Sequence, residues 1–324
     1  MPNFETITKS LQNYAKNPTI KTPVGVFVGG TSGIGLNTAI TFARVNAASE
    51  FPTKIYLVGR DSSKAIEAEN LIKEVNASAV VNFLKHDMCY IEQAKRVANI
   101  VKNHESKLNL LFVGQGGFPS GGRSETEEGI DRKVAVCYYT RWQVVDDLVS
   151  LLAKAAEDGE SARVITVLGA GREAKAETLD ITDFEMKNNY SVMRILSDTP
   201  AYNTLAAQRF AREYPKVSFI HTSPGFVTTS VFRDTAWYLR PFLKFATWFF
   251  AVTPKVSGES HLYAGLTAAE YDHGAHMLNQ KMDEVYTEAE KESNKGLFSV
   301  ELQEALWKDT ERVFNLAISR DASQ

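Results

Sequence analysis

Cysteine is scarce in this chain of 324 residues, and its scarcity limits the kinds of site that the protein can build. There are two cysteines, Cys89 and Cys137, and they do not form a CxxC pair. A disulfide framework or a structural zinc site needs more thiols at closer spacing. We therefore expect reduced, buried thiols, no metal site and a cytoplasmic location.

Strong net charge is also missing, and so is any long uninterrupted apolar run. The formal net charge of −3 gives no electrostatic reason to expect a nucleic-acid partner. The most apolar stretch, residues 236–252, contains Arg240, Pro241 and Lys244, so it falls short of a membrane-spanning helix. Residues 1–21 are polar and mixed in charge, which is not the pattern of a secretory signal. We expect neither a nucleic-acid partner nor a membrane span.

The most informative stretch covers residues 24–60. An apolar run at 24–28 precedes a glycine-rich turn, a helix-periodic apolar pattern and a second apolar run at 55–58. This order predicts strand, turn, helix and strand, the βαβ unit that binds a dinucleotide at the helix start. The predicted phosphate-binding turn comprises Gly29, Thr31, Ser32, Gly33, Ile34 and Gly35.

The glycine spacing resembles that of the short-chain dehydrogenase/reductase superfamily. That family begins its motif with Thr-Gly, where this chain has Val28-Gly29, and Gly33 and Gly35 follow at the family's spacing. The resemblance covers about residues 24–229 and implies an α/β fold, a doubly wound parallel sheet of Rossmann type. Strands that alternate with helices along the chain favour the same class. No linker or repeat interrupts the sequence, so we predict one domain over 1–324, with a cofactor-binding core at 24–229 and a lid and C-terminal helices at 230–324.

The residue after the second strand bears on the choice of cofactor. An acidic side chain there would bind the ribose hydroxyls of NAD, but this chain has Arg60. A planar cation suits a 2′-phosphate, so we predict NADP(H), although a solvated strand-end charge is the simpler alternative. By resemblance the cofactor site also includes Asp87, Met88, Gly114, Gly116, Pro224, Gly225, Val227 and Thr229. For Asp87 a helix-capping role ahead of Ile91 is nearly as good an interpretation.

The resemblance breaks at the catalytic positions. The family uses a tyrosine, a lysine one helical turn later, a serine after the fifth strand and an asparagine on the preceding long helix. Leu168-Gly169 stands at the serine position, and no Tyr-x-x-x-Lys occurs in the expected region. A tyrosine at its ordinary pKa of about 10 is a poor base at neutral pH without a nearby cation.

Tyr190 and Tyr202 are the candidate proton carriers. Arg194 follows Tyr190 by one helical turn and could supply the cation, whereas Thr199-Pro200 predicts a helix start that places Tyr202 early on the helix. For both tyrosines ordinary packing is the competing interpretation. His221, after the sixth strand, is a further candidate.

Several other motifs set expectations for individual elements. Ser124-x-x-Glu127 predicts a capping box for a long helix that runs to about Ala156. Tyr138-Tyr139 lie on that helix, whose inner face should look toward the nicotinamide end of the site. There they could replace the lost polar groups, although aromatic residues at helical spacing are usually core. Together with Leu168-Gly169-Ala170-Gly171 and Trp307-x-x-Thr310, these residues resemble a divergent branch of fungal short-chain dehydrogenase-like proteins. A C-terminal helix at about 300–318 should carry an apolar stripe of Leu302, Leu306, Val313 and Leu316 or Ala317.

These observations lead to one preferred function and two alternatives. We predict an NADP(H)-dependent oxidoreductase for a bulky apolar carbonyl, alcohol or enone, with unusual acid–base residues. The aromatic-rich segment 236–252 fits an apolar lid and a homodimer interface about equally, and a membrane-surface contact less well; ordinary core under a capping helix is a simpler alternative. A non-redox isomerase or cyclase, or an NADP(H)-binding sensor, could use the same scaffold.

Overall fold

Seven parallel strands form one sheet at the centre of the fold. The computed structural model describes residues 4–117, 121–225 and 252–321. The strands lie in the order β3-β2-β1-β4-β5-β6-β7. Their bounds are β1 Val24–Val28, β2 Lys54–Gly59, β3 Val80–Lys85, β4 Leu110–Val113, β5 Arg163–Val167, β6 Ser218–Thr222 and β7 Gly274–Leu278. The predicted doubly wound α/β class is confirmed.

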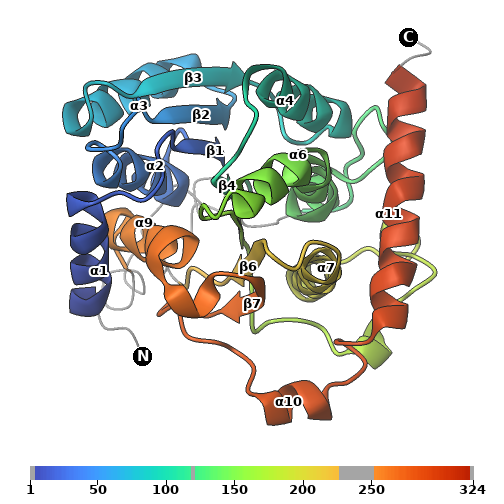
Figure 1. Ribbon diagram of the computed structural model, residues 1–324. Coiled ribbons are helices and arrows are strands. Elements are labelled where there is room, and N and C mark those ends of the chain that lie inside the picture. The colour runs from blue at the N-terminus through green and yellow to red at the C-terminus, as the bar shows by residue number, and fades with distance from the viewer. Residues whose placement is uncertain (1–3, 118–120, 226–251, 322–324) are drawn as a thin grey trace, which may run out of the picture.

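Helices cover both faces of the sheet (Figure 1). One face packs against α1 Phe4–Lys16, α2 Gly33–Val45, α3 Ser62–Val75 and α9 Pro254–Leu262. The other packs against α4 Ile91–His104, α6 Thr140–Glu157 and α7 Val192–Glu213, and α11 Val300–Asp321 lies outside these helices. Short helical segments are α5 Arg132–Val134, η1 Ala135–Tyr139, η2 Ala176–Thr178, η4 Tyr263–Thr267, η5 Ala269–Tyr271 and α10 Glu288–Ser293. Because both faces are covered, β1 is buried along its whole length.

The strand order reverses between β1 and β4. From β1 the chain adds β2 and β3 on one side, and then returns to place β4 on the other side. Val28 pairs with Val58 of β2 and with Val113 of β4, so the three strands end side by side. In open parallel sheets, ligands bind beyond the carboxyl ends of the strands at such a reversal. The architecture therefore directs attention to the loops after β1, β2, β4 and β5.

The long helix before β5 begins later than the capping box predicts. Asp131, not Ser124, caps it, because one carboxylate oxygen of Asp131 accepts the N–H groups of Lys133 and Val134. The other oxygen accepts the Ser124 N–H at 2.7 Å. The helix then runs through α5, the π-helical η1 and α6 to Glu157, which agrees with the expected end.

Helix α7 also begins at a different residue from the one predicted. Ser191 caps it, with its hydroxyl accepting the Arg194 N–H at 3.1 Å, and Pro200 lies inside the helix. The prediction of a start at Thr199-Pro200 is therefore wrong. An interior proline removes one helical hydrogen bond. Its ring packs over Gly169, where an ideal Cβ would lie 3.1 Å from the Pro200 Cγ.

The C-terminal helix α11 carries the predicted apolar stripe, and the last residue of the stripe is Ala317 and not Leu316. Leu306, Val313 and Ala317 are buried, whereas Leu316 is 46% exposed. The helix packs along α7 and α4, outside the layer that covers the sheet (Figure 1). The aromatic-rich segment lies outside the described residues, apart from Val252.

Candidate cofactor and active site

The turn after β1 has the geometry of a phosphate-binding loop. Gly29 has a φ of +79°, and an ideal Cβ there would lie 2.9 Å from the Gln115 nitrogen. A Cβ on Gly35 would lie 2.5 Å from the Gly29 oxygen. Both positions therefore exclude a side chain. Ser32 precedes α2 without a side-chain capping bond, so the N–H groups of the first helical turn stay available to an anion.

Arg60 and Asp87 lie next to each other at the ends of β2 and β3. The Arg60 side chain is 68% exposed, and its Nη1 lies 4.0 Å from the Asp87 Oδ2. Asp87 does not bond the first amides of α4. Glu128 does so instead, accepting the N–H groups of Ile91 at 2.8 Å and Glu92 at 3.0 Å. The capping interpretation of Asp87 is thus wrong, and its carboxylate accepts the Cys89 N–H at 3.1 Å.

Arg141 joins the carboxyl ends of β4 and β5. Its guanidinium is buried and donates to the carbonyl oxygens of Val113 at 3.1 Å, Val167 at 2.9 Å and Gln115. Burial lowers the pKa of Arg141 to about 10. Three other predicted cofactor-site residues lie near this edge. Met88 is buried, and a Cβ on Gly114 would meet the Phe112 ring. Gly116 has a φ of +144°, which favours glycine.

The neighbouring aromatic pair points away from this edge. The Tyr138 hydroxyl bonds Thr310 Oγ1 at 2.8 Å, and the Tyr139 hydroxyl donates to Asp309 at 3.4 Å, both on α11. Both side chains are fully buried, so the structure agrees with the alternative that they are core residues and not replacements for the lost polar groups. Both tyrosines lie in the π-helical stretch η1.

The two candidate tyrosines occupy different environments. Tyr190 is half-buried, just before α7, and its hydroxyl donates to the Gly122 carbonyl at 3.2 Å. Tyr202 is fully buried, with its ring 5.4 Å from that of Tyr138. Its hydroxyl has no hydrogen-bond partner among the described residues, and burial raises its pKa above the ordinary value. The structure does not bring the two tyrosines together, and their catalytic roles stay predictions.

Arg194, the cation predicted to act on Tyr190, bonds other residues. Its Nε donates to Asp198 at 2.8 Å and its Nη1 donates to the Asn189 carbonyl at 2.9 Å. The nearest cation to the Tyr190 ring in the described contacts is Lys133, whose Nζ lies 5.5 Å from the ring centroid.

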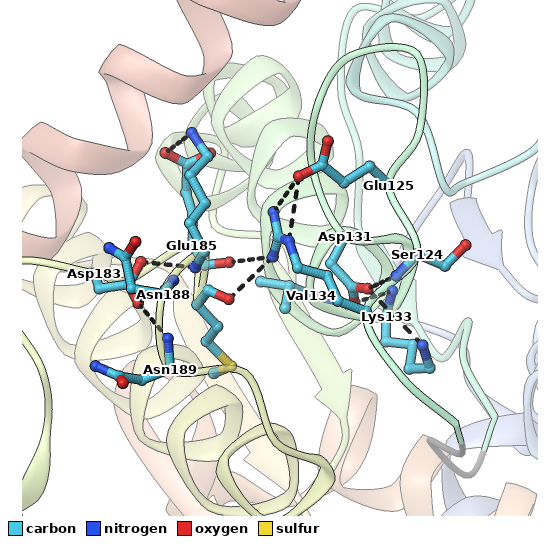
Figure 2. A network of polar contacts seen from close by, with 12 residues as sticks. Ser124, Glu125, Asp131, Lys133, Val134, Asp183, Glu185, Asn188 and Asn189 are labelled. Carbon is cyan, nitrogen blue, oxygen red and sulfur yellow. Dashed lines mark hydrogen bonds and ion pairs between the residues drawn. The ribbon is translucent and has the colours of Figure 1, made fainter.

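A polar network fixes the loop that carries Tyr190 (Figure 2). Arg123 donates to Glu125 and to the carbonyls of Glu185 and Met186 at 3.0 and 3.1 Å. Asp183 accepts the backbone N–H groups of Lys187, Asn188 and Asn189. These bonds join the segment before α5 to the segment before α7.

The sequence reasoning missed a buried cluster at the ends of β5 and β6. His221, Thr204, Glu173 and Tyr286 form a continuous series of hydrogen bonds there. Burial lowers the pKa of His221 to about 3, so the ring is neutral at physiological pH. The sequence singled out only His221 of these residues, as a candidate after the sixth strand, but His221 lies inside β6, one residue before its end. Glu173 and Tyr286 are 113 positions apart and no spacing connects them.

The loop after β6 is described only at its start. Gly225 has a φ of +66°, and an ideal Cβ there would lie within 1.8 Å of the Gln280 Oε1. The Ser223 N–H donates to the Leu278 carbonyl at 2.8 Å, which holds Pro224 beside the end of β7. Val227 and Thr229 lie outside the described residues.

Comparison with known proteins places the chain in a family. An oxidoreductase of Emericella nidulans is 31% identical over 280 residues, which span 84% of this chain and 78% of the relative. The chain belongs to the short-chain dehydrogenase/reductase superfamily. A polyprenol dehydrogenase of Homo sapiens is 25% identical over 88% of this chain and 82% of the relative. No protein-family model matches the chain.

The fold agrees with this membership. A short-chain dehydrogenase from Sphingobium yanoikuyae, solved in complex with NADPH, superposes with a TM-score of 0.54 at 16% identity. The match covers 78% of this chain and 86% of that one. Within the described ranges, no helix combines the length and the apolar character needed to cross a membrane.

Proposed function

We propose that this short-chain dehydrogenase/reductase is an NADP(H)-dependent oxidoreductase that acts on a bulky apolar carbonyl, alcohol or enone. The observation that carries the proposal is the open start of α2 behind the Gly29–Gly35 turn, with the exposed Arg60 at the end of the next strand. The unpaired N–H groups of α2 would bind the pyrophosphate and Arg60 the 2′-phosphate. The bound nicotinamide supplies hydride exchange.

Two further observations support the substrate class. The human relative is named a polyprenol dehydrogenase, and the segment at 236–252 is rich in aromatic side chains. We propose that this segment contacts the substrate, in which role its aromatic side chains would favour an apolar substrate. Tyr190 and Tyr202 remain the proposed proton carriers. The greater access of Tyr190 to solvent supports that residue over Tyr202.

The test of cofactor choice is the substitution Arg60→Glu. Replacing the cation by an anion should raise the Kd for NADPH by about 100-fold through lost attraction and added repulsion to the 2′-phosphate, while the Kd for NADH changes little. The matched control is Arg96→Glu, the same charge change at an exposed residue of α4. Nicotinamide fluorescence titration measures both constants. Equal losses for NADPH and NADH, or equal losses in both variants, would overturn the assignment of Arg60.

One observation favours a non-redox isomerase or cyclase as the second candidate. The turn after β5 carries Leu168-Gly169-Ala170-Gly171 and thus no hydroxyl side chain to polarise a carbonyl. Loss of NADPH absorbance in the presence of a bulky ketone separates the two functions, since an isomerase leaves the cofactor unchanged.

A further inference from the structure

A buried carboxylate lies beside the ends of β5 and β6, outside the chemistry described so far. The side chain of Glu173 is fully buried. Its Oε2 accepts the Gly171 N–H at 2.7 Å and the Tyr286 hydroxyl at 2.6 Å, and its Oε1 accepts the Thr204 hydroxyl at 2.8 Å. A carboxylate removed from water is retained only where hydrogen bonds replace its hydration. The three donors, which come from three separate segments, fulfil this requirement.

The remaining bonds of the cluster have a fixed direction. The Gly169 N–H donates to His221 Nε2 at 3.2 Å, so in the neutral ring the proton is on Nδ1. Nδ1 then donates to Thr204 Oγ1 at 2.9 Å, and the hydroxyl hydrogen of Thr204 goes to Glu173. The series therefore begins at Gly169 and ends at Gly171. It holds the turn after β5 at both of its ends.

A second segment crosses the same edge. We call residues 279–286 the β7 turn, because the Val285 N–H bonds the Met277 carbonyl at 2.7 Å and returns the chain alongside β7. An ideal Cβ on Gly171 would lie 3.0 Å from the Val285 Cγ1, and Gln280 packs against Gly225. The β7 turn thus contacts the segments that follow β5 and β6. Its last residue, Tyr286, connects it to Glu173.

We infer that Glu173 is a positioning residue that fixes the turn after β5 and holds the β7 turn across the ends of β5 and β6 as a wall of the substrate site. This inference rests on the proposed function. Ligands of open parallel sheets bind beyond the carboxyl ends of the strands, so a segment held across two of those ends is placed to contact substrate. The cofactor-binding turn lies on the other side of the strand reversal, at β1 and β2.

Amide hydrogen exchange tests whether Glu173 holds the turn after β5 and the β7 turn in place, and it requires no known substrate. Tyr286→Phe and Thr204→Val each remove one hydrogen bond to Glu173 and keep the side-chain volume. We expect exchange to accelerate about tenfold in peptides covering 168–174 and 277–287, since bonds to charged groups contribute strongly to local stability. Exchange at 24–45 should stay unchanged. Thr204 is buried, whereas Tyr286 is half-buried. If Thr204→Val fails to fold, Tyr286→Phe alone decides the test.

The matched control is Tyr263→Phe. The Tyr263 hydroxyl donates to the Glu270 carboxylate at 2.7 Å, so this pair has the same two groups as Tyr286 and Glu173. It lies beside the start of β5, at the amino ends of the strands and not at their carboxyl ends. This variant should leave exchange at 168–174 and 277–287 unaltered. Unchanged exchange in Tyr286→Phe, or the same acceleration in Tyr263→Phe, would overturn the inference.

A kinetic readout separates positioning from general destabilisation. With NADPH and 9,10-phenanthrenequinone, a bulky apolar dicarbonyl, as the probe, Tyr286→Phe should raise KM about tenfold and leave the Kd for NADPH within about twofold. A KM equal to that of the unmutated protein would contradict the inference that the β7 turn forms a wall of the substrate site. If the unmutated protein neither binds NADPH nor reduces the probe, the proposed function fails, and the exchange comparison still decides whether Glu173 clamps the two segments.

Discussion

At the scale of single residues, the carboxyl edge of the sheet is held by buried polar side chains in place of the family's catalytic ones. Arg141 binds carbonyl oxygens at the ends of β4 and β5, and His221 accepts the Gly169 N–H from the turn after β5. Both groups are buried. The guanidinium is saturated by carbonyl oxygens, and both nitrogens of the imidazole are bonded, to the Gly169 N–H and to the Thr204 hydroxyl, so both groups position the edge and have little capacity left for proton transfer.

This leaves the two candidate tyrosines to be distinguished by experiment. Tyr190→Phe should lower turnover about 100-fold if its hydroxyl carries the proton, as is typical for loss of a general acid. If Tyr190 is the carrier, Tyr202→Phe should leave turnover unchanged and raise the free energy of unfolding by up to about 1 kcal/mol, because it removes a buried hydroxyl that lacks a partner among the described residues.

Steady-state kinetics and urea denaturation of both variants check these outcomes. A large loss of turnover in Tyr202→Phe with unaltered stability would reverse the assignment and make the buried tyrosine the proton carrier.

Residues whose role depends on local backbone geometry could be predicted from sequence. Gly29 has a positive φ and a neighbour too close for a side chain, and both follow from the position of a glycine between a strand and a helix. Glu173 could not be found in this way. Its partners come from α7, β6 and the segment after β7, so only the folded chain brings them together.

At the scale of elements, the alternation of apolar runs and helical patterns predicted the fold class, but it missed β7, which lies in the segment 230–324 where a lid and C-terminal helices were expected. The other errors lie at helix starts. Ser124 and Thr199 are both good capping residues, but Asp131 and Ser191 cap the helices. Local sequence cannot rank two capping candidates that lie a few residues apart, because tertiary contacts decide between them. In α7, Pro200 lies inside the helix and packs on Gly169, from the distant turn after β5.

Helix α11 is anchored by one large side chain, and this anchor can be tested. Trp307 is buried, with its ring 4.9 Å from Phe210 and with Arg209 4.8 Å above it. Trp307→Ala should lower the free energy of unfolding by about 3–5 kcal/mol through the cavity that it leaves. The control Leu316→Ala, on the exposed side of the same helix, should change it by less than about 0.5 kcal/mol.

Urea denaturation monitored by circular dichroism measures both variants. Equal effects of the two substitutions would show that α11 does not depend on its buried stripe for attachment.

At the scale of the whole molecule, the two faces of the sheet have separate cores and each contains a buried neutral histidine. Burial lowers the pKa of His221 to about 3 and that of His261 to about 4, from 6.5 in the unfolded chain. Below pH 6.5 the unfolded state binds protons that the folded state does not, so each histidine destabilises the fold as the pH falls.

From these pKa values, each histidine should cost about 2 kcal/mol of stability at pH 5 relative to pH 7. The variant His261→Gln loses one of the two contributions. Its free energy of unfolding should therefore fall less steeply than that of the unmutated protein between pH 7 and pH 5. Parallel pH profiles for the two proteins would contradict a neutral buried His261.

The central claim concerns the cofactor, and direct titration tests it. The purified protein is titrated with NADPH and, separately, with NADH while nicotinamide fluorescence is followed. The open start of α2 and the exposed Arg60 predict saturable binding of NADPH with a Kd at least about tenfold below that of NADH. Absence of binding by either nucleotide, or a preference for NADH, would contradict the account.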